Sequence, residues 1–293
     1  MSTMTPMTTN IAPLHALQRN RKTHVMAIIN ATPDSFSDGG VHTTESLRTT
    51  IASFVEDGAT ILDVGGQSTA PGTPEVSAEE EMSRVLPVIK LIRDHPQTKD
   101  AIISVDTYRA AVAEAAILAG ADIVNDVSAG TLDEQMLPTV ARLGKTICLM
   151  HMRGTPGTMT TLTDYGAAGL VPTLADELQQ RVAAAERAGI RRWRLLLDPG
   201  IGFAKSAAQN LELLRRFDEL RDWPGLRGLP WLLGPSRKSF VGRITGVADP
   251  RQRVWGTAAA VAAAVQGGAD IVRVHDVRPM VQVVKMADAI WRV

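Results

Sequence analysis

The sequence predicts an α/β fold, a single (β/α)8 barrel in which eight parallel strands are each followed by a helix. Eight short runs of aliphatic and β-branched residues recur along the 293-residue chain. Stretches with helical spacing and helix-start signals lie between these runs. A doubly wound sheet is the competing arrangement, but such a sheet rarely carries eight repeats of even length. The even alternation of strand and helix therefore favours the barrel.

The predicted elements follow one another without an intervening linker. Strands are expected at residues 24–29, 60–64, 101–105, 122–124, 146–150, 193–197, 230–233 and 270–274. Ser77 with Glu80, and Thr131 with Glu134, have the spacing of capping boxes and predict helix starts. Gly-Ala pairs at 58–59, 120–121 and 268–269 predict helix ends before the next strand. We expect one barrel domain over residues 21–293, preceded by a flexible tail or linker over residues 1–20.

The composition excludes several classes of protein. The 31 Lys and Arg residues balance 31 Asp and Glu residues, so the basic surplus typical of nucleic-acid-binding proteins is missing. The longest apolar run, residues 258–265, is far shorter than the ~18–20 residues of a membrane span. One cysteine, Cys148, cannot form an internal disulfide or a cysteine-based zinc site. We expect a soluble cytoplasmic protein that binds neither nucleic acid nor membrane.

Polar side chains follow every predicted strand at the point where the strand ends. In a (β/α)8 barrel these strand ends meet at one rim, and that rim carries the chemistry. The sequence therefore predicts a polar site built from all eight strands. Its candidate residues are Asn30, Asp63, Asp106, Asn125, His151, Asp198, Ser236, Arg237, Lys238, Arg273 and His275.

Each of these residues also has a purely structural interpretation. Asp and Asn at strand-to-helix junctions are common helix caps, and we expect Asp276 to be one. Asp63 could equally tie down the glycine turn at residues 65–66. His24 lies at the opposite end of its strand, so we expect it to be structural, and we expect Cys148 to be a core residue. The recurrence of polar residues after all eight strands is what favours a functional site.

The types of side chain at this rim indicate what it binds. Asp106, Asn125 and Asp198 offer carboxylate and amide groups that match a flat, nitrogen-rich heterocycle. Lys238, Arg273 and His275 form a cationic cluster near the last two strands, where such barrels frequently bind phosphate. Two polar, glycine-containing loops, residues 31–40 and 65–72, are expected to act as lids. A zinc site is not expected, because the histidines lack a third ligand.

Eight sequence motifs resemble those of dihydropteroate synthases, a family of pterin-binding TIM-barrel enzymes. They occur in the family's order from about residue 24 to the C-terminus, which makes the resemblance specific. The motifs are NATPDSFSDGG (30–40), DVGGQSTAPG (63–72), SVDT (104–107), NDVS (125–128), MHMRGTP (150–156), LDPGIGF (197–203), SRKSF (236–240) and RVHD (273–276).

The resemblance implies an enzyme of folate biosynthesis, a transferase that joins 7,8-dihydropterin-6-ylmethyl diphosphate to 4-aminobenzoate and releases diphosphate. It implies an SN1-like path in which Asp106, Lys238, Arg273 and His275 are the catalytic residues. Of the substrate-binding residues, Asp106, Asn125, Asp198 and Lys238 would hold the pterin, and Met150 is a further substrate-binding residue. Asn30, Arg273 and His275 would hold the diphosphate, with Mg²⁺ near Asn30 and Asp38. Thr69, Pro71, Phe203 and Ser239 would shape the aminobenzoate pocket, and Phe36 would close over it.

The chain departs from the family pattern at Ala70, where the family usually has an arginine, and at Ala204, where it usually has a glycine. The change at Ala70 leaves open a pterin-binding protein with weak or no activity. A methyltetrahydrofolate:corrinoid methyltransferase, which also binds a pterin in a barrel, is a second alternative. Members of the family generally dimerise through late helices, and the alanine-rich helix expected at residues 257–265 could form such an interface. We therefore expect a homodimer.

Overall fold

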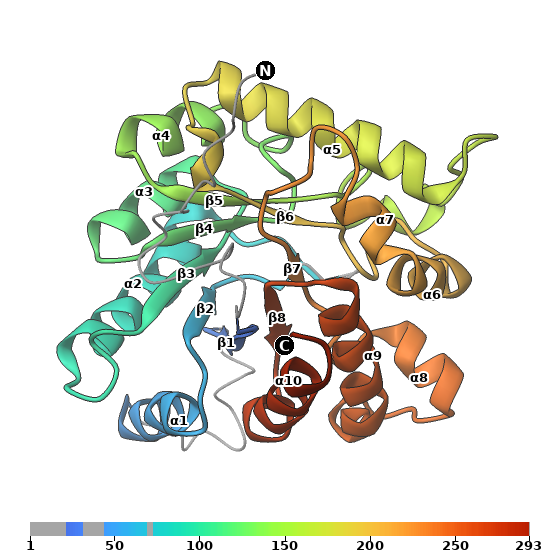
Figure 1. Cartoon of the computed structure of the whole chain (residues 1–293). Helices are drawn as coiled ribbons and strands as arrows, with labels where there is room; N and C mark the ends of the chain where they lie inside the picture. The colour runs from blue at the N-terminus through green and yellow to red at the C-terminus, as the bar shows by residue number, and fades with distance from the viewer. Residues whose placement is uncertain (1–21, 32–43, 69–72, 293) are drawn as a thin grey trace.

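The computed structural model describes residues 22–31, 44–68 and 73–292 (Figure 1). Strands and helices alternate along these residues and form the predicted (β/α)8 barrel, so the predicted fold class is confirmed. The predicted tail over residues 1–20 lies outside the described residues. The strands are β1 His24–Asn30, β2 Ile61–Gly65, β3 Ile102–Asp106, β4 Ile123–Asp126, β5 Thr146–Met150, β6 Leu195–Asp198, β7 Leu232–Leu233 and β8 Ile271–Val274.

All strand pairs are parallel, in the order β6-β5-β4-β3-β2-β1-β8-β7. β1 pairs with both β2 and β8, which brings the first and last strands together. One parallel bridge between Leu197 and Trp231 joins β6 to the segment before β7 and closes the ring. β7 has only two residues, since Pro230 and Pro235 lack the N–H groups needed to lengthen its ladder.

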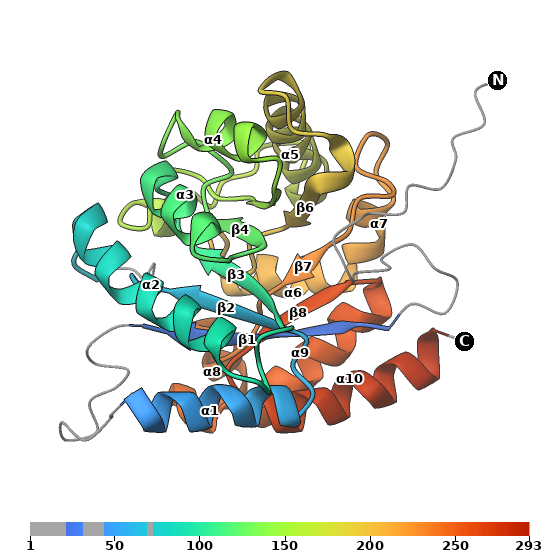
Figure 2. The same cartoon turned by 90° about the vertical axis from the view of Figure 1, so that its left-hand side faces the viewer.

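The helices surround the strands on the outside of the barrel (Figures 1 and 2). They are α1 Thr44–Glu56, α2 Ala78–Asp94, α3 Ala110–Leu118, α4 Met136–Leu143, α5 Leu170–Arg187, α6 Ala207–Arg215, α7 Phe217–Arg221, α8 Ser239–Thr245, α9 Val254–Gly267 and α10 Val277–Trp291. None of the helices described is long and apolar enough to cross a membrane.

Because successive side chains of a strand point to opposite faces, the barrel has two apolar layers. Outward-facing residues such as Val25, Ala27 and Ile29 pack against the helices. The inward-facing layer takes one buried residue from each strand and forms a floor across the barrel. Its members are Met26, Ile61, Ile102, Ile123, Cys148, Leu196, Leu232 and Ile271. The prediction that Cys148 is a core residue is thus confirmed.

The floor explains why the polar residues meet at one end. The residue two positions further along each strand also points inward, but nearer the carboxyl end of the barrel. These residues are Ile28, Asp63, Ser104, Asn125, Met150, Asp198, Gly234 and Arg273. The strand register therefore stacks a polar layer on an apolar one.

One of the two predicted helix starts is wrong. The Ser77 hydroxyl accepts a 3.1 Å hydrogen bond from the Glu80 backbone and begins α2, as predicted, while the Glu80 carboxylate pairs with Arg84. Thr131 does not begin a helix, because its hydroxyl bonds to the Ser128 carbonyl and α4 starts only at Met136. A complete capping box, formed by Ser206 and Gln209, begins α6 and was not predicted.

Candidate active site

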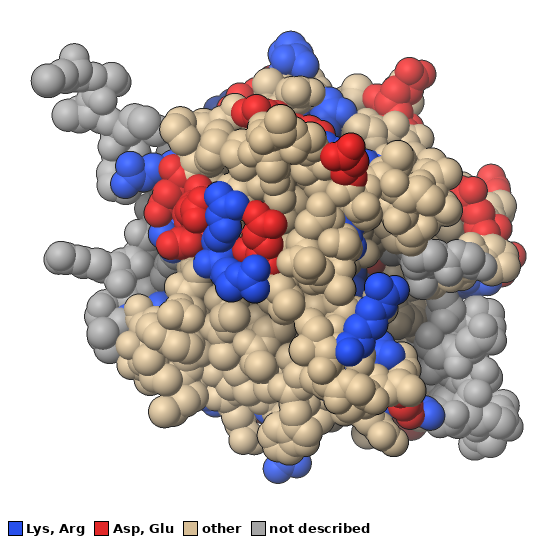
Figure 3. Space-filling model, turned by 90° about the vertical axis from the view of Figure 1, so that its right-hand side faces the viewer, with Lys and Arg blue, Asp and Glu red and all other residues tan. Residues whose placement is uncertain are grey.

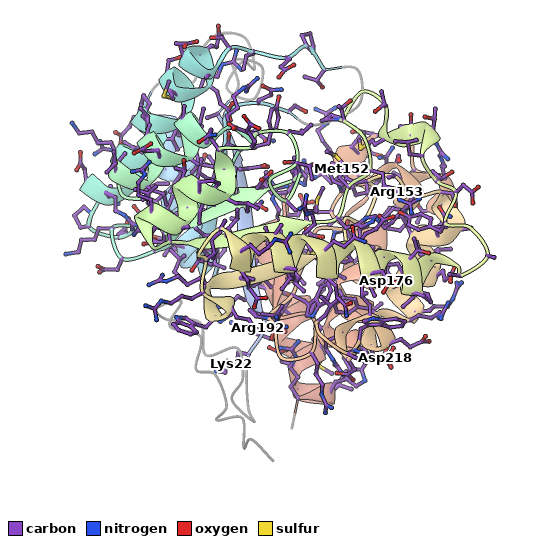
Figure 4. All side chains as sticks on the ribbon, turned by 90° about the horizontal axis from the view of Figure 1, so that it is seen from above. Lys22, Met152, Arg153, Asp176, Arg192 and Asp218 are labelled. Carbon is purple, nitrogen blue, oxygen red and sulfur yellow. The ribbon has the colours of Figure 1, made fainter. Side chains whose placement is uncertain are left out.

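The carboxyl ends of the strands open on one side of the molecule. Met152 and Arg153, which follow β5, lie on the opposite side from Lys22 and Arg192, which precede β1 and β6 (Figure 4). A cavity of about 750 Å³ lies at the carboxyl end. The predicted site residues that line it are Asn30, Asp106, Phe203, Ser236, Arg237, Lys238, Ser239, Arg273 and His275.

A smaller cavity of about 30 Å³ lies deeper in the barrel. Asp106, Phe203, Lys238 and Arg273 line both cavities, so the two form one site with an inner and an outer part. The predicted residues Asn125, Met150 and Asp198 line only the inner part. The structure thus brings together twelve predicted residues, which come from six strands, from the loops after β6, β7 and β8, and from the start of α8. Phe36, Asp38, Thr69 and Pro71, and the departure at Ala70, lie outside the described residues.

Arg273 is the charged centre of the inner part. Its Nε lies 2.6 Å from Asp63 Oδ2, and its Nη2 lies 2.6 Å from Asp106 Oδ2. Asn125 Nδ2 donates to the same Asp63 oxygen at 3.1 Å. The alternative in which Asp63 only ties down a glycine turn is therefore wrong. Burial raises the pKa of Asp106, and the nearby charge of Arg273 opposes that rise.

Asp198 and Lys238 are two further groups of opposite charge in the inner part, close enough to affect each other's pKa. Burial raises the pKa of Asp198, although the Gly200 N–H, 2.7 Å from its Oδ1, favours the carboxylate. Burial lowers the pKa of Lys238, and the charge of Asp198 opposes that change. The Lys238 ammonium lies 3.9 Å from the centroid of the Phe203 ring, a cation–π contact. Phe203 packs in turn on Met150, so an apolar wall faces the charged groups.

His275 differs from its predicted role as a cation. Burial and the charges of Arg273 and Arg237 lower its pKa to about 3, so the ring is neutral near pH 7. The Ser236 hydroxyl accepts from the His275 backbone N–H at 3.1 Å and lies 3.0 Å from its Nδ1. A hydroxyl that donates to Nδ1 leaves the proton on Nε2. His275 is thus a neutral hydrogen-bond donor beside two cations.

The loop after β7 is held in place by contacts among its own residues and side chains at the start of α9 and at the β8–α10 junction. Arg237 has a left-handed backbone with φ of 59°, and its guanidinium pairs with Asp276 at 2.5 and 3.0 Å. The Asp276 side chain therefore makes no cap to α10, contrary to the prediction, because it is committed to Arg237. Arg253 Nη1 donates to the Arg237 carbonyl at 2.9 Å. These contacts fix the backbone that carries Lys238.

Asn30 is the candidate metal ligand that the structure describes. It ends β1, is exposed, and lines the outer cavity with Arg237 and His275. Within the described residues no cluster of three or more His, Cys, Asp or Glu side chains could hold a metal. Mg²⁺ commonly takes only one or two protein oxygens and completes its shell with substrate phosphates and water. An amide oxygen at the rim of this cavity, beside the cationic side chains, fits that kind of site.

Known proteins resemble the chain over most of its length. The family model described as "Pterin binding enzyme" matches residues 26–275. The dihydropteroate synthase of Synechocystis sp. is 49% identical over 275 residues, which cover 93% of this chain and 91% of that protein. The chain belongs to the dihydropteroate synthase family. The predicted family is thereby confirmed.

Two further comparisons place the chain within the dihydropteroate synthase family. The folic acid synthesis protein fol1 of Pneumocystis carinii is 52% identical over 271 residues, which cover 92% of this chain but 36% of that protein. The chain thus spans about a third of the length of this relative. The solved structure of Xanthomonas albilineans dihydropteroate synthase with 4-aminobenzoic acid has a TM-score of 0.83 and 41% identity, and covers 94% of this chain and 95% of that one.

Sequence reasoning missed several residues that support this dihydropteroate synthase fold. Lys205 is buried, lines the outer cavity and contacts His151. Glu177 in α5 holds both His151 and Arg153. The one available signal was a lysine placed directly after the glycine-rich turn that follows the sixth strand. Nothing in the sequence linked Glu177 to the rim, because helix α5 contributes no other residue to the site.

Arg273→Met is expected to lower the free energy of unfolding by about 3–5 kcal/mol, since it leaves two buried carboxylates without their cation. Urea unfolding measures this change. The matched control is Arg278→Met, which removes an arginine whose side chain is 79% exposed and 3.9 Å from Asp57. The control substitution should lower the free energy of unfolding by less than about 1 kcal/mol. Equal stability of the two variants would show that Arg273 does not compensate the buried carboxylates.

Proposed function

We propose that the chain is a transferase that condenses 7,8-dihydropterin-6-ylmethyl diphosphate with 4-aminobenzoate, giving 7,8-dihydropteroate and diphosphate. The observation that carries this proposal is the division of one continuous cavity. Asp106, Asn125 and Asp198 line its inner part, and Asn30 and His275 line its outer part. The Xanthomonas albilineans relative, solved with 4-aminobenzoic acid, supports the identity of the second substrate.

The inner part suits the pterin. A flat heterocycle rich in ring nitrogens needs both acceptors and donors around its edge, and it needs apolar surface against its faces. Asp198 and Asn125 supply the polar groups, while Met150 and Phe203 supply the apolar surface. Asp106 lies beside Arg273 at the junction of the two parts, where the pterin methylene would sit.

The outer part suits the departing diphosphate. The C–O bond of the methylene breaks, and the diphosphate leaves with the electron pair. Lys238 and Arg273 stabilise its negative charge, and the Nε2–H of His275 donates to it. Asp106 offsets the positive charge that develops on the pterin. The aromatic amine then forms the C–N bond and loses its proton, so no enzymic nucleophile is required.

Asn30 would hold Mg²⁺ together with oxygens of the diphosphate. When bound, the ion supplies Lewis-acid stabilisation of the leaving group. The predicted contribution of Asp38, and the roles of Phe36, Thr69, Pro71 and Ser239 around 4-aminobenzoate, remain predictions. The cytoplasmic location, and the exclusion of nucleic acid and membrane as partners, also remain predictions.

The activity is tested by diphosphate release in the presence of Mg²⁺. Release should require both the pterin diphosphate and 4-aminobenzoate. Lys238→Met should lower kcat/KM by about 10²–10³-fold, because it removes a charge aimed at the leaving group. Lys90→Met, which changes an exposed lysine of α2, is the matched control and should leave the rate unchanged.

The same assay separates the alternatives. A methyltetrahydrofolate:corrinoid methyltransferase would transfer a methyl group to a corrinoid and release no diphosphate. A pterin-binding protein without activity would bind the pterin diphosphate but show no turnover. Either result would replace the proposed reaction.

Ala70→Arg restores the arginine that the family usually has in this loop. A recovered charge-assisted hydrogen bond of about 1.5–3 kcal/mol corresponds to about 10–100-fold in affinity or rate. We expect the variant to raise turnover or lower the KM for 4-aminobenzoate by a factor in this range. Steady-state kinetics with Ala70→Lys as the charge-matched control measures it. No change in either constant would mean that another group already performs this role.

We further propose a homodimer through α9 and α10. Their outer faces expose Trp255 at 82% and Met286 at 64%, and a groove between them is lined by Ala258, Ala262 and Ile290. Figure 3 shows a wide area with few charged side chains on the face where α8 and α9 lie. Exposed apolar surface of this extent is typical of an interface between protein chains.

Sedimentation at micromolar concentration should give about twice the chain mass of 31.4 kDa. Ala262→Arg, which introduces a charge into the groove between α9 and α10, should shift the chain to a monomer. Gln180→Arg, which adds the same charge at an exposed position of α5, is the control. A wild-type monomer would contradict the proposed interface.

A further inference from the structure

We infer that Lys205 is a positioning residue, which acts with His151 and Glu177 to fix the loop after β6 and thereby hold the Phe203 ring in the site. The inference rests on the proposed function, because it concerns the same cavity. It assigns a role to a buried lysine that the reaction described above does not use. Fully buried lysines are rare in proteins unless they are paired, so this one calls for a physical account.

The contacts of Lys205 join two loops. Its Nζ donates to the Phe203 carbonyl at 3.0 Å and lies 3.0 Å from His151 Nδ1. The side chain is buried, with the residue 8% exposed. Lys205 directly precedes Ser206, the N-cap of α6. Its ammonium therefore ties the turn that carries Phe203 to the end of β5.

His151 faces Lys205 in a defined tautomer. Burial and the charge of Lys205 lower its pKa to about 4, so the ring is neutral. A neutral ring that accepts from Lys205 at Nδ1 carries its proton on Nε2. That Nε2 lies 2.7 Å from Glu177 Oε2 and donates to it. The backbone N–H of His151 also donates to the Asp198 carbonyl at 2.8 Å, which locks β5 to β6 at this level.

Glu177 is itself held in place. Burial alone would raise its pKa, but hydrogen bonds from His151 and Arg153 outweigh this effect and lower it to about 2. Arg153 Nη2 lies 2.5 Å from Glu177 Oε1, and Figure 4 shows Arg153 alongside α5. The Arg153 guanidinium also lies 4.0 Å from the ring centroid of Tyr165, whose hydroxyl donates to the Ala204 carbonyl. The chain of contacts thus returns to the loop where it began.

The loop has little room to move. A Cβ on Gly200 would lie 2.0 Å from the His151 carbonyl oxygen, so the turn lies directly against the end of β5. A Cβ on Gly202 would lie 2.8 Å from Lys238 Cδ. Phe203 lines both parts of the cavity and contacts Lys238. A shift of its backbone would therefore change the boundary between the two substrates.

Lys205→Met keeps an unbranched side chain only one atom shorter and removes its donors. We expect kcat/KM for 4-aminobenzoate to fall about 10–100-fold, mainly through KM, since a small misplacement of a substrate-orienting group has an effect of this size. The KM for the pterin diphosphate, whose polar partners Asp198 and Asn125 remain, should change less than threefold. Lys90→Met is again the matched control.

A double-mutant cycle tests whether the residues act as one unit. The double variant with Lys205→Met and Glu177→Leu should lower kcat/KM for 4-aminobenzoate little more than either single variant. Each substitution breaks the same series of contacts. The effects of Lys205→Met and Lys90→Met on kcat/KM should be additive. An equal rise in the KM values of both substrates, or additive effects of Lys205→Met and Glu177→Leu on kcat/KM, would show that Lys205 only fills space and would overturn the inference.

A measurement on the wild-type chain covers the case in which the variants do not fold. Nitrogen-15 NMR of the labelled histidines should report His151 as the neutral Nε2–H tautomer at pH 7. An Nδ1–H tautomer or a charged ring would contradict the contact with Lys205. This readout does not depend on activity. A wild-type chain that releases no diphosphate but has this tautomer would refute the proposed reaction and leave the Lys205 contacts standing.

Discussion

The carboxyl end of this barrel depends on the pairing of buried opposite charges. A carboxylate or an ammonium taken out of water is costly unless a partner of opposite sign lies close by. Arg273 bridges Asp63 and Asp106, and Lys238 lies close enough to Asp198 for each charge to shift the pKa of the other. These pairs stand directly above an apolar floor, where the low dielectric strengthens each interaction. Removing one partner leaves the other charge buried without compensation, which lowers the free energy of unfolding.

The same pairing prepares the site for chemistry. Charges that are fixed before the substrate arrives need no reorganisation during the reaction, which is the basis of electrostatic stabilisation in enzymes. Lys238 and Arg273 line both parts of the cavity, Asp198 lines only the inner part, and Asp106 pairs with Arg273 where the two parts meet. His275 adds a neutral donor to the outer part, because burial and its cationic neighbours prevent the ring from becoming charged. One set of contacts therefore serves both stability and the binding of a substrate that is neutral at one end and anionic at the other.

The loops that carry the substrate-facing residues are fixed by hydrogen bonds and ion pairs with residues that do not take part in the proposed reaction. Arg253 and Asp276 hold the turn that carries Lys238, and Lys205 and Tyr165 hold the turn that carries Phe203. Loops on a barrel rim are the most variable part of the fold, so their precision comes from such contacts rather than from the strands. Many polar side chains around the site thus position the loops and do not contact the substrate directly.

The sequence alone determined the strands, the fold and the rim on which the site lies, because these follow from the two-residue period of strands and the rule that strand ends meet. Helix-start signals failed where the side chain had a competing partner. The Thr131 hydroxyl binds the Ser128 carbonyl three residues earlier, and Asp276 pairs with Arg237, which is 39 residues away. Only the tertiary structure decided that His275 is neutral, that Arg273 turns inward to Asp63, and that Lys205 meets His151. Charge state and partner choice depend on desolvation and on neighbours 210 and 54 residues away along the chain, which no local pattern encodes.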